Sequence, residues 1–202
     1  MINTIVFDIG NVLAPFTWRE TYADLFDEET AAKVGEATVL YSEMWAELDK
    51  GSLPDEAIIE EFKKKNPEVA DKIENAVWEI YRRMNPYSYA SDWLRTLREQ
   101  GYKIYILSNY GRTGFNLSKP RFDFLKYAHG GVISYQVEIN KPDPRIYMIL
   151  CQKYGISPNE AIFIDDNADN IEAAANLGFN TILHKDEETS IKKFAELGVE
   201  IK

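Results

Sequence analysis

The sequence INTIVFDIGNVL occupies residues 2 to 13. Its short apolar run, Ile5 to Phe7, is partly β-branched and stops at Asp8, as a buried parallel strand does where it meets a loop. We therefore predict that Asp8 lies at the carboxyl end of a strand, where open α/β sheets bind their ligands. An aspartate there can serve as a nucleophile or a metal ligand, or it can simply end the strand. This stretch alone leaves both interpretations open.

Three later stretches repeat this arrangement, because each brings polar side chains to the end of an apolar segment or close to one. They are LSN at residues 107–109, NKPDP at residues 140–144 and FIDDN at residues 163–167. Together with Asp8 they would place carboxylates, a hydroxyl and a cation on one edge of the sheet. These are the groups that Mg²⁺-assisted phosphoryl transfer requires.

With these motifs the sequence resembles the haloacid-dehalogenase-like hydrolases over essentially the whole chain. The four motifs are FDIGNVL (7–13), LSN (107–109), KPDPRIY (141–147) and FIDDN (163–167), in the order and spacing of the family. One such motif can occur by chance, whereas four in order are highly specific. The sequences of these motifs are most similar to those of sugar-phosphate phosphatases of the helical-cap subgroup. Examples are bacterial glucose-1-phosphate phosphatases and the amino-terminal phosphatase domain of soluble epoxide hydrolases.

The pattern of elements predicts an α/β fold, with a Rossmann-like parallel sheet core, helices on both faces and an inserted all-helical cap. Residues 1–14 and 86–202 are expected to form the catalytic core, and residues 15–85 the cap. Helical spacing predicts one long cap helix from Thr30 to Gly51, followed by helices at about 54–65 and 67–84. Further strands are expected at 103–107, 132–134, 161–164 and 180–183, and a loop at 110–120.

Composition limits the class of protein and its partners. The 202 residues, 45% of them hydrophobic, can bury one core and a small second module. A net charge of −10 argues against a nucleic-acid partner. It also repels a phosphorylated metabolite, so the site must be locally positive through Lys141, a metal ion and backbone N–H groups.

Features that report on location point to the cytoplasm. The single cysteine, Cys151, excludes an intramolecular disulfide and suits a reducing compartment. The sequence has neither a long apolar run nor a signal-peptide pattern. We expect a cytoplasmic monomer or weak homodimer that binds a small phosphorylated metabolite, with neither nucleic acid nor membrane as a partner.

The resemblance implies a role for each catalytic motif residue. Asp8 is the expected nucleophile, which forms an aspartyl-phosphate. Lys141 neutralises Asp8 and a phosphate oxygen, and Ser108 and the backbone N–H of Asn109 bind the phosphoryl group. Asp165 orients Lys141 or a metal-bound water.

The resemblance also implies a Mg²⁺ site. Its expected ligands are Asp8, the backbone carbonyl of Gly10 and Asp166, since hard oxygen donors suit this ion. Adjacent acids such as Asp165 and Asp166 repel each other unless a cation lies nearby.

Gly10 is where the sequence departs from the family. The usual residue is a second aspartate, the general acid and base, which contributes roughly 10² to 10⁴ in rate. Glycine can do neither, and the neutral Asn11 cannot replace it. The glucose-1-phosphate phosphatase branch also has glycine here, which favours retained activity. We expect a preference for leaving groups that need little protonation, as in anomeric sugar phosphates, acyl phosphates or aryl phosphates.

Most aromatic residues of the cap recur at helical spacing and are expected to form its core. Trp18 and Trp45 are the exceptions that we predict to contact the substrate. Three other functions compete with an Mg²⁺-dependent phosphatase. A 2-haloacid dehalogenase needs a halide-binding arginine, for which Arg19 is the candidate, and a phosphomutase needs the acid that Gly10 replaces. A non-catalytic binding protein would explain Gly10 but not the intact motifs.

Overall fold

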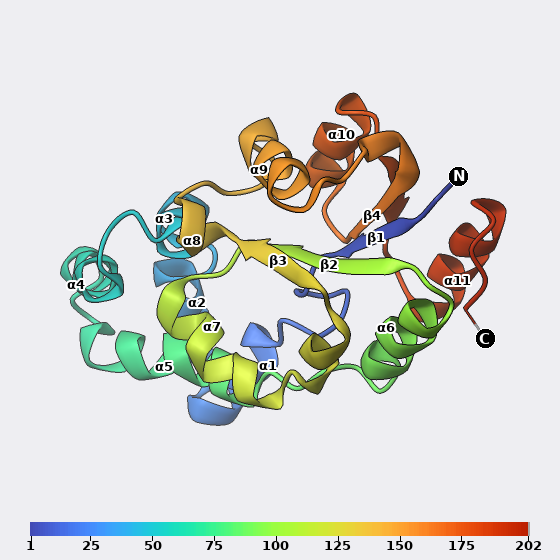
Figure 1. The fold of residues 1–202 in the computed structure, drawn as a ribbon. Coiled ribbons are helices and arrows are strands. Elements are labelled where there is room, and N and C mark those ends of the chain that lie inside the picture. The colour runs from blue at the N-terminus through green and yellow to red at the C-terminus, as the bar shows by residue number, and fades with distance from the viewer. Residues whose placement is uncertain (202) are drawn as a thin grey trace.

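One five-stranded sheet organises the molecule, and all its neighbouring strands are parallel. The computed structural model describes residues 1–201 and places the strands in the order β3-β2-β1-β4-β5 (Figure 1). The strands are β1 (Thr4–Phe7), β2 (Lys103–Ser108), β3 (Gly130–Ile133), β4 (Ala161–Asp165) and β5 (Asn180–Leu183). The strand that ends at Asp8 therefore lies in the centre of the sheet.

The helices divide into those before β2 and those after it. The first group is α1 (Trp18–Leu25), α2 (Glu28–Ala37), α3 (Ser42–Lys50), α4 (Asp55–Lys65), α5 (Ala70–Arg83) and α6 (Ala90–Glu99). The second group is α7 (Arg112–Ser118), α8 (Ser134–Val137), α9 (Pro144–Tyr154), α10 (Ala168–Asn176) and α11 (Glu187–Glu196). In Figure 1, α1 to α5 lie together beyond the end of the sheet at which the strands finish.

Alternate side chains of β1 point into two separate apolar layers, as the period of a strand requires. Phe7 faces the layer of α6 and α11, where its ring contacts Trp93 and Phe194. Val6 faces the opposite layer, which includes Tyr147 of α9. Because helices cover both faces of a parallel sheet, the predicted fold class is confirmed.

The long helix predicted from Thr30 to Gly51 is wrong, because two helices, α2 and α3, occupy this segment. The interruption begins at Thr38, whose hydroxyl donates to the carbonyl of Val34 over 2.6 Å and lies 3.0 Å from the hydroxyl of Tyr22. Such a side chain offers the backbone an alternative to helical hydrogen bonding. The helix before it is capped by Asp27, which accepts the N–H of Thr30.

The predicted loop at 110–120 is also wrong, since it contains α7. Its glycines allow close packing instead of turns. A side-chain carbon at Gly114 would lie 2.7 Å from the ring of Tyr81 in α5, and one at Gly111 would lie 2.8 Å from the carbonyl of Leu48 in α3. Helix α7 thus packs directly against the inserted helices. The division into a core and a cap of residues 15–85 stays a prediction.

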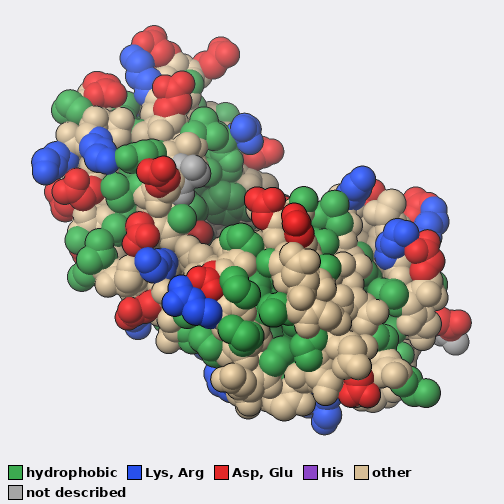
Figure 2. Space-filling model, turned by 90° about the horizontal axis from the view of Figure 1, so that it is seen from above, with side chains coloured by type: hydrophobic (Ala, Val, Ile, Leu, Met, Phe, Trp, Pro, Cys, Tyr) green, Lys and Arg blue, Asp and Glu red, His purple; other side chains and the backbone are tan. Residues whose placement is uncertain are grey.

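The surface seen from above is hollowed between two lobes (Figure 2). Hydrophobic side chains gather in this hollow, and acidic side chains lie beside it. Across residues 1–201, the structure contains no helix with both the length and the apolar character needed to cross a membrane.

Candidate active site

The register of the sheet brings three of the four motifs to one edge. Phe7 pairs with Ile106 of β2 and with Ile164 of β4, so that the ends of the three strands are level. The N–H of Asp8 continues this pattern by donating to the carbonyl of Ile164 over 3.0 Å. Side chains that follow parallel strands at the same level must meet, and this is the usual ligand-binding edge of such a sheet.

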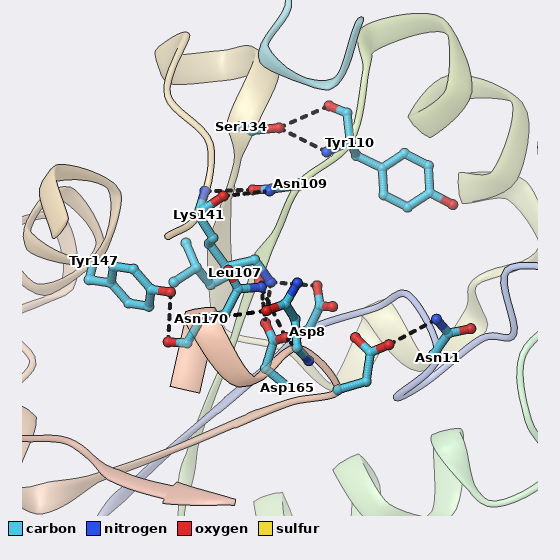
Figure 3. Close-up of polar contacts among 12 residues, drawn as sticks. Asp8, Asn11, Leu107, Asn109, Tyr110, Ser134, Lys141, Tyr147, Asp165 and Asn170 are labelled. Atoms are coloured by element: carbon cyan, nitrogen blue, oxygen red, sulfur yellow. Dashed lines mark hydrogen bonds and ion pairs between the residues drawn. The ribbon is translucent and has the colours of Figure 1, made fainter. Parts of the chain in front are cut away.

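Lys141 lies between the carboxylates of Asp8 and Asp165 (Figure 3). Its Nζ is 2.9 Å from Oδ1 of Asp8 and 2.5 Å from Oδ2 of Asp165, and it donates to the carbonyl of Leu107 over 3.0 Å. The side chains of Lys141, Asp8 and Asp165 are 1%, 9% and 0% exposed. Burial disfavours the charged ammonium group, but Asp165 and Asp8 outweigh it and raise the pKa of Lys141. Lys141 therefore stays a cation within the site.

Asp165 is held entirely by groups of the protein. Besides Lys141, its carboxylate accepts the backbone N–H of Asn167 over 2.8 Å and the amide of Asn170 over 3.0 and 3.1 Å. The carbonyl of Asn170 in turn accepts the hydroxyl of Tyr147 (Figure 3). These donors occupy both oxygens of Asp165, which therefore orients Lys141.

Asn109 fixes Lys141 from the other side. Its amide nitrogen donates to the carbonyl of Lys141 over 2.9 Å, and its amide oxygen accepts the N–H of Lys141 over 2.8 Å (Figure 3). The sequence suggested a role only for the backbone N–H of Asn109. Nothing in the sequence pairs these two residues, which are 32 positions apart, so only the fold reveals this contact.

Asp8 lies in an environment that opposes its ionisation. Burial raises the pKa of Asp8 to about 7, while Lys141 and a hydrogen bond from Ser108 oppose the rise and Asp165 adds to it. Ser108 is itself buried beside Asp8. A further cation next to Asp8 would favour its ionised form.

The residues expected to bind Mg²⁺ fit this ion. Carboxylate oxygens of Asp8, Asp165 and Asp166 lie within 4.8 Å of one another. Since protein donors occupy Asp165, Asp8 and Asp166 are the acids available to a metal. Asp166 is held by the amide of Asn11 at 2.9 Å, and desolvation raises its pKa despite that bond.

Gly10 is also compatible with a metal site. The backbone bridge between Gly10 and Ala14 uses the N–H of Asn11 and the carbonyl of Ile9. It therefore occupies neither polar group of Gly10. Hard oxygen donors of this kind are what Mg²⁺ prefers.

A cavity of about 160 Å³ opens above these residues. It is lined by Asp8, Gly10, Asn11, Phe16, Trp45, Asp49, Tyr81, Met84, Asn109, Tyr110 and Asp166. Trp45 stacks on Tyr81 with ring centroids 6.2 Å apart, and Phe16 meets Trp45 edge-on at 5.8 Å. One side of the cavity is therefore polar and comes from the strand ends, whereas the other is largely aromatic and comes from the inserted helices.

The structure does not bring Trp18 to this cavity. Trp18 lines a separate hollow with Arg19 and Tyr22, and its ring covers Gly35, where a side-chain carbon would lie 2.7 Å away. The guanidinium of Arg19 lies over the Trp18 ring at 4.3 Å. Arg19, the candidate halide ligand, is consequently absent from the lining of the Asp8 cavity as well.

Asp49 is the carboxylate in this lining that the sequence did not lead us to predict. It lies four residues after Trp45 on α3, so the two share one face of the helix, and this spacing was the signal that could have found it. Asp49 is partly buried. Burial raises the pKa of Asp49 to about 7, a hydrogen bond from the N–H of Gly111 opposes this rise, and Asp8 adds to it.

Comparison with known proteins identifies similar chains. The model of the haloacid dehalogenase-like hydrolase family matches residues 2–178. The (S)-2-haloacid dehalogenase 4A of Burkholderia cepacia is 28% identical, over 70% of this chain and 59% of that protein. The sesquiterpene phosphatase astK of Aspergillus oryzae is 24% identical, over 86% of this chain and 85% of that protein. This chain spans about half or less of the length of several other relatives.

Solved structures share the fold over nearly their whole length. A predicted HAD-like family hydrolase from Porphyromonas gingivalis superposes with a TM-score of 0.79 at 25% identity, covering 99% of both chains. The HAD family enzyme bt-2542 of Bacteroides thetaiotaomicron, in complex with magnesium and inorganic phosphate, has a TM-score of 0.73 at 22% identity, covering 92% of this chain and 95% of that one.

Proposed function

Since the chain belongs to the haloacid dehalogenase-like hydrolases, we propose that it is an Mg²⁺-dependent phosphatase. Its substrate is a small phosphorylated metabolite, such as a sugar 1-phosphate, and the reaction passes through an aspartyl-phosphate on Asp8. The observation that carries this proposal is the ion pair of Lys141 with Asp8, which lines one cavity together with a second available carboxylate, Asp166.

The geometry supports phosphoryl transfer through the charges it offers to a dianionic group. Asp8 supplies the attacking oxygen, and the Lys141 ammonium offsets the charge that gathers on the phosphoryl oxygens. Asp165 and Asn109 keep Lys141 in place through its side chain and its backbone. Asp8, Asp166 and the carbonyl of Gly10 would hold Mg²⁺, which, when bound, reduces the repulsion between Asp8 and the phosphate.

A 2-haloacid dehalogenase is the second candidate, because such enzymes are among the relatives of this chain. Two observations weigh against it. The residues that the structure shows lining the cavity include no arginine that could bind a halide. Asp166, held towards the site by Asn11, would have no task in a reaction without a metal.

The test measures phosphate release from sugar, acyl and aryl phosphates, with and without Mg²⁺, and halide release from a 2-haloacid. We expect Mg²⁺-dependent phosphate release, which Asp8→Asn lowers by at least about 10⁴-fold because the nucleophile is lost. Asp143→Asn is the matched control. Asp143 caps α9 outside the cavity, and asparagine caps a helix equally well, so its activity should match the wild type.

Two results would contradict the proposal. Halide release without Mg²⁺ would establish the dehalogenase instead. No turnover of any compound, with Mg²⁺ still bound, would identify a non-catalytic binding protein. Cytoplasmic location and a monomeric or weakly dimeric state stay predictions.

A further inference from the structure

We propose that Asp49 is the general acid and base of this site, supplied from α3 in place of the aspartate that Gly10 lacks. The inference rests on the proposed phosphatase function. It is based on the position of Asp49 in the lining of the same cavity as Asp8 and Gly10.

Asp49 is held in place by contacts with the sheet-bearing part of the chain. The N–H of Gly111, which follows β2, donates to its carboxylate. The hydroxyl of Ser134 in α8 donates to its backbone carbonyl over 2.6 Å. One turn earlier, the amide of Asn140 donates to the carbonyl of Ala46 over 2.6 Å. These three contacts position the last turn of α3 relative to Asp8.

Gly51 strengthens this docking. It ends α3 with a φ of +67°, a conformation that side chains rarely adopt. A side-chain carbon there would also lie 2.7 Å from Cβ of Tyr135. The backbone just after Asp49 therefore approaches α8 as closely as only glycine permits, so that the acid enters the cavity from a defined direction.

The other titratable residues of the cavity cannot take this role. Asp8 serves as the nucleophile and Asp166 as a candidate metal ligand. Burial raises the pKa of Tyr81 and that of Tyr110 well above the ordinary value of 10.0, so neither exchanges protons near neutral pH. Asp49 remains, with a pKa near 7, and efficient general acids and bases have pKa values close to the working pH.

The proposed steps balance in atoms and electrons. A carboxylate oxygen of Asp8 forms a bond to phosphorus while the bond from phosphorus to the leaving oxygen breaks, and the leaving oxygen takes the proton of the Asp49 carboxyl. In the second step a water oxygen attacks phosphorus and gives a proton to the Asp49 carboxylate. The bond between phosphorus and Asp8 then breaks, which restores the Asp8 carboxylate and the protonated Asp49 carboxyl group and releases phosphate.

This assignment changes the expected substrate range. With Gly10 alone, only leaving groups that need little protonation should react well. If Asp49 donates the proton, alkyl phosphates, whose alkoxide leaving group needs one, become good substrates. The dependence of rate on the leaving group therefore distinguishes a proton donor from a residue that only supports the cavity.

The experiment compares the wild type and Asp49→Asn on an alkyl phosphate and on p-nitrophenyl phosphate. Asparagine preserves the shape of Asp49 and an acceptor for the N–H of Gly111. We expect kcat/KM to fall roughly 10² to 10⁴-fold on the alkyl phosphate, and less than about 10-fold on the aryl phosphate, whose leaving group needs no proton. Glu43→Gln, an exposed acid on the same helix, is the matched control and should change neither rate.

A rescue variant tests the role of Asp49 independently of its contacts. A side-chain carbon at Gly10 meets only the Asp8 carboxylate, at 4.0 Å, so the first carbon of a side chain has room there. Adding Gly10→Asp to Asp49→Asn should recover much of the alkyl phosphatase activity. Equal losses on both substrates without this recovery would overturn the inference. Absence of turnover in the wild type would overturn the proposed function first, and the inference with it.

Discussion

The two sides of the cavity are built on different physical principles. On the sheet side Asp8 lines the cavity, and the buried Lys141 behind it forms ion pairs with both Asp8 and Asp165. The side formed by the inserted helices is an aromatic wall around one acid, Asp49. A buried charge that loses its partner costs several kcal/mol of unfolding free energy. Packed rings, in contrast, tolerate substitution by other apolar side chains of similar volume. The sheet side therefore suits the shared chemistry, and the helical side suits selection of the substrate.

Among the variants that test this difference between the two sides, removal of the Lys141 cation should have the largest effect on stability and activity. Lys141→Met leaves Asp8 and Asp165 buried without their counter-charge, which costs about 3 to 5 kcal/mol of unfolding free energy, and it should abolish phosphatase activity. Urea denaturation measures the loss of stability.

Two further variants check that burial is the cause. Lys192→Met removes an exposed ion pair with Glu188 and should change stability by less than about 1 kcal/mol. Adding Asp165→Asn to Lys141→Met should recover part of the lost stability. If Lys141→Met proves no more harmful than Lys192→Met, the contrast between the two sides fails.

The aromatic wall should respond more mildly. Trp45→Leu should raise KM roughly 3- to 10-fold with little change in kcat, because a ring contact is worth about 0.5 to 1.5 kcal/mol. Trp18→Leu should leave KM unchanged and instead lower stability by about 1 to 3 kcal/mol, since Trp18 packs on Gly35 in another hollow. Steady-state kinetics and melting curves of both variants provide the test. A larger KM effect at Trp18 would reverse the structural assignment.

The smallest expected effect is the pH-dependent loss of folding stability that Asp49 causes. Its pKa rises from an ordinary 3.8 to about 7 on folding, so the folded protein keeps a proton that the unfolded chain loses between about pH 4 and pH 7. Stability from this residue therefore falls as pH rises through that window. Asp8, Asp55 and Lys141 are the charged neighbours that act on it.

We accordingly expect Asp49→Asn to melt roughly 2 to 4 °C above the wild type at pH 8 and at the same temperature near pH 4. Melting curves recorded from pH 4 to pH 8 measure this difference, with Glu43→Gln, at an exposed acid of the same helix, as the control variant. An equal shift of the melting temperature at both pH values would mean that the folded protein does not raise the pKa of Asp49.

Predictions held best where a short stretch carries both a strand and the side chain that follows it. The strand at 180–183 was predicted with its observed bounds, and those at 103–107 and 161–164 each fall one residue short. Where a contact between distant segments decides the structure, the predictions failed. Thr38 interrupts a helix through Tyr22 and Val34, and Gly114 serves a packing contact with Tyr81 instead of a turn.

The sequence was sufficient to predict the parallel sheet and the grouping of Asp8, Lys141 and Asp165 at its edge. Asp8 follows β1 and Asp165 ends β4, and parallel strands finish at the same edge, while Lys141 lies in the loop that leads into α9. Which side chains of the inserted helices face Asp8 depends on how these helices pack, and this could not be predicted from the sequence. Trp18 and Trp45 look alike in the sequence, but the packing of α1 on α2 turns one away, and the docking of α3 on the loop at Gly111 brings the other, together with Asp49, into the cavity.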